Sequence, residues 1–448
     1  MSLSEQTSTA RTDVSGTAFP TPAELRVETL GPCAHRSPLA TTDAHEPFTD
    51  ERRRVLVCSD AEELASAGGT PPSFEPAGPR ARIFFEPSRL TCGVLTCGGL
   101  CPGLNNVVRA IVHRLAYAYG VRRILGFRYG YDGLAHPDVH VPWALGARDV
   151  EHIHERGGTA LGSSRGPQDV GCMVDTLVRL DVGILFVVGG DGGLRGASAL
   201  AREIARRRLS IGVVGIPKTI DNDIRWTWRS FGFETAVDAA RAVLAAAHVE
   251  ARDAWKGVGL VRLMGRHSGF IAAHATIASG DVDFCLIPEV PIRLDGPGGF
   301  LAALDARLDA EHHALVVVAE GAGQELVADG GPAATDPSGN VRLKDVGVFL
   351  RDSIAEHFAS EQIDGVVRYI DPSYTIRSLP TNSFDAQLCL ALGQHAVHAG
   401  MAGRTDLLIG VWNQRFVHVP IALGVAARRR VDLRGELWQR VLESTGQG

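Results

Sequence analysis

The most informative stretch of this chain reads Gly212-Val213-Val214-Gly215-Ile216-Pro217-Lys218-Thr219-Ile220-Asp221-Asn222-Asp223. An apolar, strand-like run ends at Pro217, and one lysine, one threonine and two aspartates follow it. Such a cluster is costly to hold together unless a substrate or a metal ion completes it. The lysine offers a point charge to an anion, and two carboxylates can divide proton abstraction from metal binding. A solvated turn after the strand is the structural alternative.

A glycine-rich loop lies upstream and reads Cys97-Gly98-Gly99-Leu100-Cys101-Pro102-Gly103-Leu104-Asn105-Asn106. It follows the apolar run 92–96 and leads into a segment with helical apolar spacing. A strand, a glycine turn and a helix together place backbone N–H groups and a helix N-terminus against an anion. We therefore predict that Gly98, Gly99 and Gly103 bind phosphate. The pattern matches neither a P-loop nor a dinucleotide fingerprint.

A second glycine loop, Gly189-Gly190-Asp191-Gly192-Gly193, directly follows the apolar run 182–188. Glycines around one aspartate suit a polyphosphate held close to the main chain, with the Asp191 carboxylate left for Mg²⁺. Gly-Gly-Asp-Gly also occurs in diacylglycerol, sphingosine and NAD kinases, so the loop indicates a nucleotide kinase without saying which. A tight turn between strand and helix is the structural alternative.

Composition excludes several classes of protein. The chain has 448 residues and a formal net charge of −6, which argues against nucleic-acid and membrane-surface partners. Its apolar runs are too short to span a membrane. The first residues, Met1–Glu5, carry neither the basic nor the apolar region of an export signal. The eight cysteines lack disulfide-scaffold spacing, so we expect free thiols and a cytoplasmic location.

The order of apolar segments predicts an α/β protein. Residues 1–80 are rich in Ser, Thr, Ala, Pro and charge, and we expect a partly ordered N-terminal extension there. Beyond it, glycine-bounded apolar runs alternate with helical stretches, which indicates one or two largely parallel sheets. The predicted strands lie near 92–96, 183–188, 211–216, 258–263 and 314–319.

These loops, in this order, resemble the phosphofructokinase family, most closely its long plant-like and trypanosomatid-like branch. The resemblance runs from Phe85 to Gln447. Further matching segments are 161–166, 231–236, 263–269, 287–291, 318–323 and 369–377. The resemblance implies two Rossmann-like αβα lobes with a cleft between them: residues 81–250 for the donor, 251–380 for fructose 6-phosphate, and 381–448 returning to the first lobe.

The activity that the resemblance implies is phosphoryl transfer from ATP to the 1-hydroxyl of fructose 6-phosphate, a step of glycolysis. Asp221 matches the family's catalytic base, and Thr219 would hydrogen-bond the transferring phosphoryl group or the sugar. Arg266 resembles the arginine that binds the transition state and the sugar phosphate, although a surface ion pair is the alternative. Asp191 and Asp223 match positions associated with Mg²⁺.

The substrate contacts are also taken from the resemblance. Met264 and Gly265 precede Arg266 in the sugar-binding motif, and Glu320 resembles the carboxylate that accepts from fructose hydroxyls. The 6-phosphate would meet a cluster in which Arg368 is the least distinctive member: Arg368, Tyr374 and Arg377. Part of this cluster reaches across a subunit interface in the family, so a homodimer or homotetramer is implied. Arg165 resembles the arginine at the donor's terminal phosphates.

The phosphoryl donor is the finer question. Gly192 is typical of ATP users, whereas pyrophosphate users tend to carry Asp there; Lys218 is typical of pyrophosphate enzymes. The plant-like and trypanosomatid-like ATP branch carries both, so ATP is favoured, with Gly190 also in the donor loop. Gly193 departs from the usual Ser or Thr, and Phe384 from a smaller residue. A pyrophosphate-dependent enzyme and a non-catalytic sugar-phosphate sensor are the alternatives.

Overall fold

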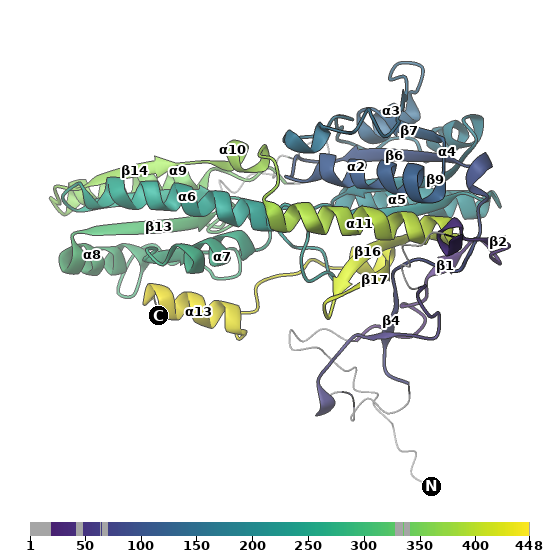
Figure 1. The fold of residues 1–448 in the computed structure, drawn as a ribbon. Coiled ribbons are helices and arrows are strands. Elements are labelled where there is room, and N and C mark those ends of the chain that lie inside the picture. The colour runs from purple at the N-terminus through teal and green to yellow at the C-terminus, as the bar shows by residue number, and fades with distance from the viewer. Residues whose placement is uncertain are drawn as a thin grey trace, which may run out of the picture.

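The computed structural model describes residues 19–41, 48–62, 64, 70–327, 335 and 341–447. Two β-sheets lie one after the other along the long axis of the molecule, each covered by helices on both faces (Figure 1). Two long helices, α6 (Phe233–Arg252) and α11 (Ser383–Met401), run along this axis and contact each other. The predicted arrangement of two αβα lobes is therefore confirmed.

The first lobe is built on a nine-stranded sheet whose centre is parallel. Its strand order is β3-β4-β17-β16-β10-β9-β6-β7-β8, and β16 to β7 run parallel. The register aligns Cys97 of β6 with Gly189 of β9, and Gly189 with Pro217 of β10. Both glycine loops and the segment after Pro217 therefore leave the sheet side by side. The strands are β3 Val55–Leu56, β4 Ser73–Pro76, β6 Thr91–Cys97, β7 Arg123–Phe127, β8 Trp143–Ala144, β9 Val182–Gly189, β10 Gly212–Pro217, β16 Leu407–Trp412 and β17 Arg415–Pro420.

The second lobe has a four-stranded parallel sheet in the order β12-β13-β11-β14. Leu263, the last residue of β11, pairs in register with Ala319, the last residue of β13. The loops that begin at Met264 and Glu320 are therefore neighbours at one edge. The strands are β11 Gly257–Leu263, β12 Phe284–Leu286, β13 His313–Ala319 and β14 Val366–Ile370.

Successive side chains along each strand point to opposite faces of the sheet, so each face of each sheet has its own apolar core. In β6, Val94 packs with α2 and α11 whereas Leu95 packs with α4 and α5. The second sheet packs against α6 and α7 on one face and α8 and α9 on the other. These helices are α2 Leu104–His113, α4 Val170–Arg179, α5 Asp191–Arg206, α7 Phe270–Ser279, α8 Phe300–Glu311 and α9 Val346–Ser360.

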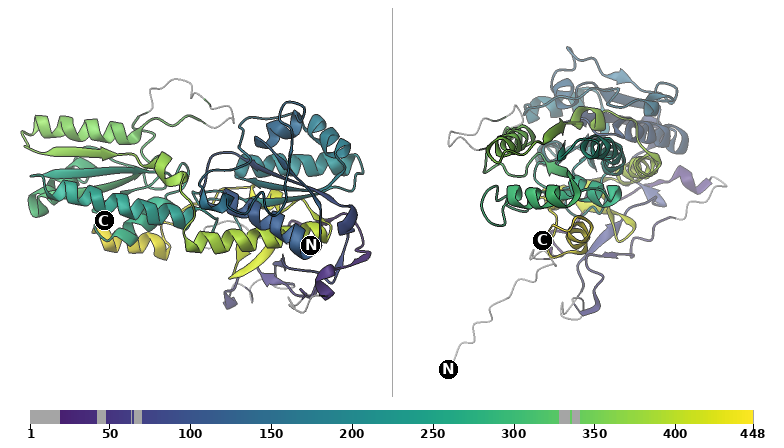
Figure 2. Two further views of the ribbon diagram at one scale, coloured as in Figure 1. Left: turned by 45° about the horizontal axis from the view of Figure 1, so that its top comes forward. Right: turned by 90° about the vertical axis from the view of Figure 1, so that its left-hand side faces the viewer.

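The two ends of the chain pack onto the lobes. Strand β4 pairs with β17 at the edge of the first sheet, and the buried Arg80 donates to Glu75 of β4 at 2.9 Å. Of the predicted N-terminal extension, residues 1–18, 42–47, 63 and 65–69 lie outside the described residues. After β16 and β17, the chain crosses to the second lobe, where α13 (Glu436–Thr445) packs beside α7 (Figure 2).

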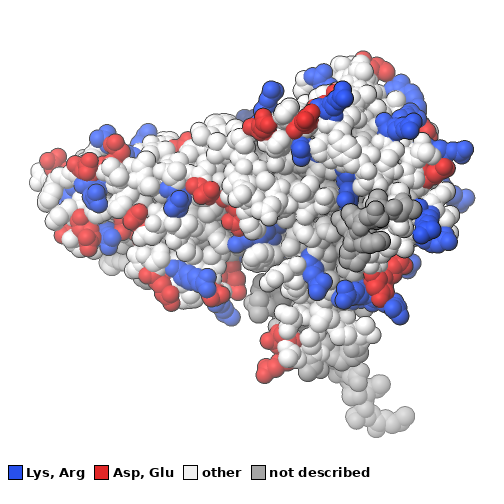
Figure 3. Space-filling model, in the orientation of Figure 1, with Lys and Arg blue, Asp and Glu red and all other residues white. Residues whose placement is uncertain are grey.

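The remaining elements are short: β1 Glu28–Thr29, β2 His35–Arg36, η1 Pro38–Thr41, β5 Arg82–Ile83, η2 Pro87–Arg89, the π-helical η3 Arg114–Tyr119, α3 Gly130–Ala135, η4 Ile153–Glu155, α10 Ser373–Arg377, β15 Arg404–Thr405 and α12 Ile421–Gly424. Acidic and basic side chains are interspersed over the face shown in Figure 3. Within the described ranges, none of the helices has the length and apolarity needed to cross a membrane.

Candidate active site

The loop after β10 is fixed by a buried asparagine. Asn222 is fully buried at a φ of 55°, where its side-chain oxygen accepts from the backbone N–H of Ser230 at 2.9 Å. This left-handed conformation is one that asparagine tolerates better than most residues. On either side, the Thr219 hydroxyl donates to Asp223 at 2.6 Å and accepts from the backbone N–H of Asp221 at 3.2 Å. The loop is therefore held by its own side chains before any ligand binds.

Asp221 lies where the loops of the two lobes meet. Its Oδ2 accepts from the backbone N–H of Arg266 at 3.4 Å, and its carbonyl accepts from the Ser268 hydroxyl at 3.2 Å. Burial raises the pKa of Asp221 to about 8, and the carboxylates of Asp223 and Glu320 act in the same direction. A carboxyl with a pKa near neutrality suits a general base.

The donor side is formed by both glycine loops with Lys218 between them. The buried Lys218 donates through Nζ to the carbonyl of Gly99 at 2.8 Å and through its backbone N–H to Gly189 at 2.9 Å. A Cβ at Gly98 would lie 3.1 Å from the same Nζ, and one at Gly99 would lie 3.6 Å from the Arg165 guanidinium. Four predicted donor contacts, Gly98, Gly99, Arg165 and Lys218, are therefore brought together.

The other predicted donor-site glycines have different surroundings. A Cβ at Gly192 would meet no atom within 4 Å, whereas a Cβ at Gly193 would lie 2.4 Å from Sγ of Cys97. Gly103 begins α2 at a φ of 106°, and a Cβ there would lie 2.7 Å from Sγ of Cys389. Gly190 is the N-cap of α5 and packs on the Lys218 carbonyl. Packing alone thus requires glycine at 103 and 193, whereas Gly192 faces open space.

Asp191 and Asp223, the predicted magnesium ligands, converge on one cationic group. Asp191 is the first residue of α5, and its Oδ2 lies 3.6 Å from Nη2 of Arg428. Oδ2 of Asp223 accepts from Nη1 of the same arginine at 2.6 Å. Carboxylates aimed at one positive charge form a donor set that fits Mg²⁺. No group of three or more His, Cys, Asp and Glu gathers within metal-binding range in the described residues, so water and phosphate oxygens would complete the coordination.

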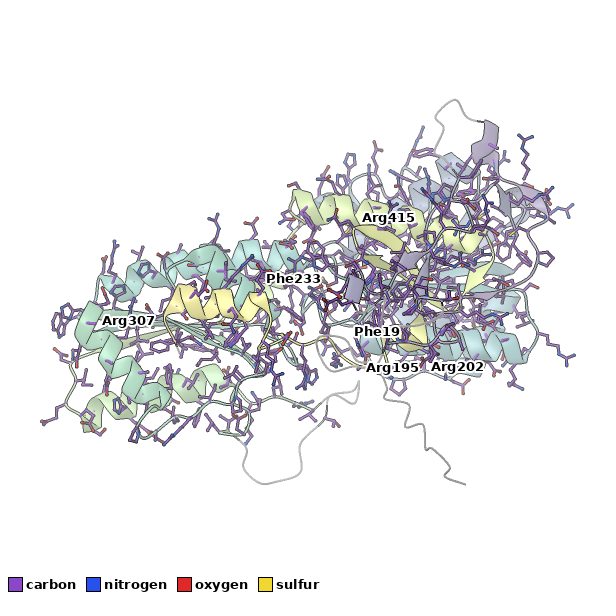
Figure 4. The ribbon with its side chains drawn as sticks, turned by 90° about the horizontal axis from the view of Figure 1, so that it is seen from below. Phe19, Arg195, Arg202, Phe233, Arg307 and Arg415 are labelled. Carbon is purple, nitrogen blue, oxygen red and sulfur yellow. The ribbon has the colours of Figure 1, made fainter. Side chains whose placement is uncertain are left out.

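The predicted sugar-binding residues face this point from the second lobe. The backbone N–H of Glu320 donates to Leu263 at 2.9 Å, which sets its side chain beside the loop of Met264, Gly265 and Arg266. Burial raises the pKa of Glu320, although the positive charges of Arg262, Arg266 and Arg377 oppose that effect. Figure 4 labels Phe233, which lies at the junction of the lobes, with Arg195 on the first lobe and Arg307 on the second.

The three predicted phosphate-binding residues are not brought together within one chain. Nε of Arg377 is buried without a hydrogen-bond partner in the described structure, and its guanidinium lies 4.3 Å from the Tyr374 ring. Arg368 pairs with Gly259, in the middle of β11, and lies 3.9 Å from Glu250 of α6. Arg377 is close enough to Glu320 for its charge to oppose the rise in the pKa of that carboxyl, and it carries the Tyr374 ring against its guanidinium, whereas Arg368 lies in the middle of the sheet.

Four residues of the site were missed in the sequence: Asn222, Arg262, Ser268 and Arg428. Arg262 is the one partly exposed residue of β11, and it binds Asp371 while lying 3.6 Å from both Glu320 and Asp345. Asn222 and Ser268 lay inside the quoted motifs without a distinct signal. For Arg428 the run of three arginines at 428–430 was a signal that could have been followed.

The comparisons with known proteins agree with this geometry. The family model described as Phosphofructokinase matches residues 91–400, which include both glycine loops and the sugar-side motifs. The chain belongs to the phosphofructokinase family. The first lobe, with its glycine loops, and the second lobe, with Arg266 and Glu320, are thus the two lobes of a phosphofructokinase.

Relatives match this phosphofructokinase nearly end to end. An ATP-dependent 6-phosphofructokinase of Amycolatopsis methanolica is 49% identical over 439 residues, covering 95% of each chain. The ATP-dependent 6-phosphofructokinase of Trypanosoma cruzi is 43% identical over 433 residues, covering 95% of this chain and 88% of the relative. The predicted resemblance to the trypanosomatid-like branch is confirmed.

Solved structures agree on the fold. The pyrophosphate-dependent phosphofructokinase of Nitrosospira multiformis superposes with a TM-score of 0.66, covering 81% of this chain and 93% of that one. Its sequence is 17% identical, so the likeness concerns the fold and not the choice of donor.

Proposed function

We propose that this protein transfers the γ-phosphoryl group of ATP to the 1-hydroxyl of fructose 6-phosphate, giving fructose 1,6-bisphosphate and ADP. The observation that carries the proposal is the position of Asp221. This carboxyl, with its raised pKa, lies between the glycine loops of one lobe and the arginine loop of the other. ATP-dependent relatives that are 41–49% identical to this chain support the same reaction.

Asp221 acts as the general base of the reaction. As the 1-hydroxyl oxygen forms its bond to the γ-phosphorus, its proton passes to the Asp221 carboxylate, and the bond to the bridging oxygen of ADP breaks. The Arg266 guanidinium neutralises charge on the transferring group, since a planar fork matches phosphoryl oxygens. The Thr219 hydroxyl, 2.6 Å from Asp223, lies in the same loop and can turn to a phosphoryl oxygen.

The donor is held by groups of the first lobe. The Lys218 ammonium and the backbone N–H groups of the glycine loops bind the phosphates, and Arg165 lies beside Gly99 to reach the terminal ones. Asp191 and Asp223 would hold Mg²⁺. Bound there, the ion would offset the charge that develops on the phosphate oxygens.

The open space at Gly192 favours ATP over pyrophosphate. Nothing in the described structure lies within 4 Å of a Cβ built there, so room remains for the α-phosphate and the nucleoside beyond it. Pyrophosphate use is the second candidate because Lys218, typical of pyrophosphate enzymes, occupies the phosphate end of the site.

For the sugar, Glu320 accepts from fructose hydroxyls, and Arg377 with Tyr374 meets the 6-phosphate. The buried Nε of Arg377 lacks a partner that a phosphate oxygen would supply. Arg368, which lies away from this site in its own chain, would serve the 6-phosphate of a second copy. In this proposal residues 81–250 form the donor lobe, 251–380 the sugar lobe, and 381–448 return to the first lobe.

A homodimer or homotetramer completes the site. Helix α11 carries a single charged residue, Asp385, and exposes Phe384 and Leu390 by 48% and 46%. Tyr374, which precedes α11 in the chain, is 73% exposed. Contact with a second copy would cover all three side chains. The eight cysteines are all free thiols, which supports a cytoplasmic location.

The test is product formation by the purified full-length protein with fructose 6-phosphate and Mg²⁺, comparing ATP with pyrophosphate. We expect fructose 1,6-bisphosphate with ATP and little with pyrophosphate. Product with pyrophosphate alone would reverse the donor assignment. An absence of product with either donor, together with measurable binding of fructose 6-phosphate, would instead indicate a sugar-phosphate sensor.

A further inference from the structure

A short segment near the C-terminus connects the base loop with the second lobe. We define residues 428–431 as the arginine strap. The backbone of Arg428 bridges to Ile224, and the backbone N–H of Arg429 donates to the carbonyl of Asp223 at 2.8 Å. The backbone N–H of Val431 then donates to Glu289 of the second lobe at 2.8 Å. The arginine strap therefore contacts both lobes within four residues.

The Arg428 guanidinium occupies the place where the two predicted metal ligands meet. It lies 2.6 Å from Asp223 and 3.6 Å from Asp191, measured to Oδ2 in each case. Asp191 also accepts from the exposed Arg195 at 3.1 Å, so it keeps one cation without Arg428. The Asp223 side chain is 5% exposed, and Arg428 is its single ion-pair partner in the part of the chain that the structure describes.

Two carboxylates this close repel each other unless a cation lies between them. A monovalent guanidinium and a divalent metal ion would compete for the same oxygens. The metal ion has the greater charge, but it must displace a group already attached to the chain. The metal ion therefore binds more weakly than it would bind two carboxylates without a counter-ion. Phosphate oxygens of a bound donor can offset this loss of affinity by acting as further ligands.

We propose that Arg428 is a positioning residue of the donor site: a built-in counter-ion that keeps Asp191 and Asp223 aimed at one point until a divalent cation displaces it. The displacement breaks one of the side-chain contacts that hold the arginine strap to the first lobe, where the Arg429 guanidinium also donates to the carbonyls of Thr227 and Trp228. Donor binding thereby loosens the strap, which also holds Glu289 of the sugar lobe. This inference rests on the proposed metal-binding function of Asp191 and Asp223.

The first experiment measures binding of Mn²⁺ to the nucleotide-free, full-length protein by electron paramagnetic resonance. Removing a positive charge from between the ligands should tighten Mn²⁺ binding in Arg428→Ala by at least about fivefold. The matched control is Arg430→Ala, an exposed arginine of the same strap, which should change the affinity by less than about twofold. Arg428→Lys keeps the charge and should stay nearer the wild type.

The outcomes separate the inference from the function on which it rests. Unchanged or weaker Mn²⁺ binding in Arg428→Ala, alongside loss of binding in Asp191→Asn, overturns the role of Arg428 and leaves the metal site in place. Binding that is indifferent to Asp191→Asn overturns the metal site itself. Equal tightening in Arg428→Ala and Arg430→Ala would mean a general charge effect, which also overturns the inference.

A measurement on the unmodified protein avoids any folding defect of the variants. Hydrogen exchange of the strap's backbone amides reports its attachment, because the Arg429 amide is bonded to Asp223. With Mg²⁺ and ADP added, we expect faster exchange in a peptide covering 426–431. Slower or unchanged exchange there would contradict displacement of Arg428.

Discussion

The backbone N–H of Arg266 points at Oδ2 of Asp221 across 3.4 Å, although the two residues follow strands of different sheets. This hydrogen bond lowers the pKa of Asp221, whereas burial and the neighbouring carboxylates raise it. Separation of the lobes would remove this bond, but it would also admit water and take Glu320 away, and these two larger changes lower the pKa. The proton affinity of the base is therefore tied to the closeness of the two lobes.

Glu320→Gln should shift the acidic limb of the pH profile of kcat/KM to lower pH. The carboxylate of Glu320 raises the pKa of Asp221, so its removal favours the ionised base. We therefore expect the limb to move to lower pH, in addition to a higher KM for fructose 6-phosphate. Glu356→Gln, which alters an exposed residue of α9, is the control and should leave the limb in place. If the acidic limb lies at the wild-type pH in both variants, Glu320 does not act on Asp221.

Gly193→Ser should destabilise the fold by about 1–3 kcal/mol, because its Cβ would be forced against the Cys97 sulfur. Urea denaturation measures the change. The control is Gly192→Ser, one residue earlier in the same helical turn. A Cβ there meets no atom within 4 Å, so the free energy of unfolding should not change. In a Cys97→Ala background the cost of Gly193→Ser should fall by about 1 kcal/mol or more. Additive effects of the two changes would refute the steric conflict.

Gly192→Asp should impair the use of ATP much more than the use of pyrophosphate. A carboxylate in the open space beside Gly192 would repel phosphate and take up room that pyrophosphate does not need. The measurement is kcat/KM for each donor at saturating fructose 6-phosphate, and we expect at least a tenfold larger loss with ATP. Similar losses with both donors would mean that position 192 does not select between them.

The loops that directly follow strands could be predicted from the sequence, because the ends of the strands fix where these loops begin. Parallel strands of matched register place Cys97, Gly189 and Pro217 level with one another, so motifs after those residues had to meet. The motif after Leu263 meets Glu320 for the same reason.

Contacts made by distant segments could not be predicted in this way. Arg428 reaches Asp223 because the chain crosses between lobes after β17, and no local pattern encodes that path. The close approach of Gly193, in the first turn of α5, to Cys97, at the end of β6, likewise joins residues far apart in the sequence. The departure of Gly193 from Ser or Thr therefore had no explanation in the sequence alone. Arg368 pairs with Gly259 in the middle of the sheet, and its expected contribution to the phosphate site of a second copy stays a prediction.

The most direct test of the central claim is the turnover of Asp221→Asn with ATP and fructose 6-phosphate. Asparagine keeps the size of the side chain and its contact with the Arg266 N–H, but it cannot accept the proton of the 1-hydroxyl. We predict that kcat falls by about 10²–10⁴-fold while binding of fructose 6-phosphate, measured by calorimetry, stays within a few-fold of the wild type. Turnover near the wild-type value would contradict the assignment of Asp221 as the base.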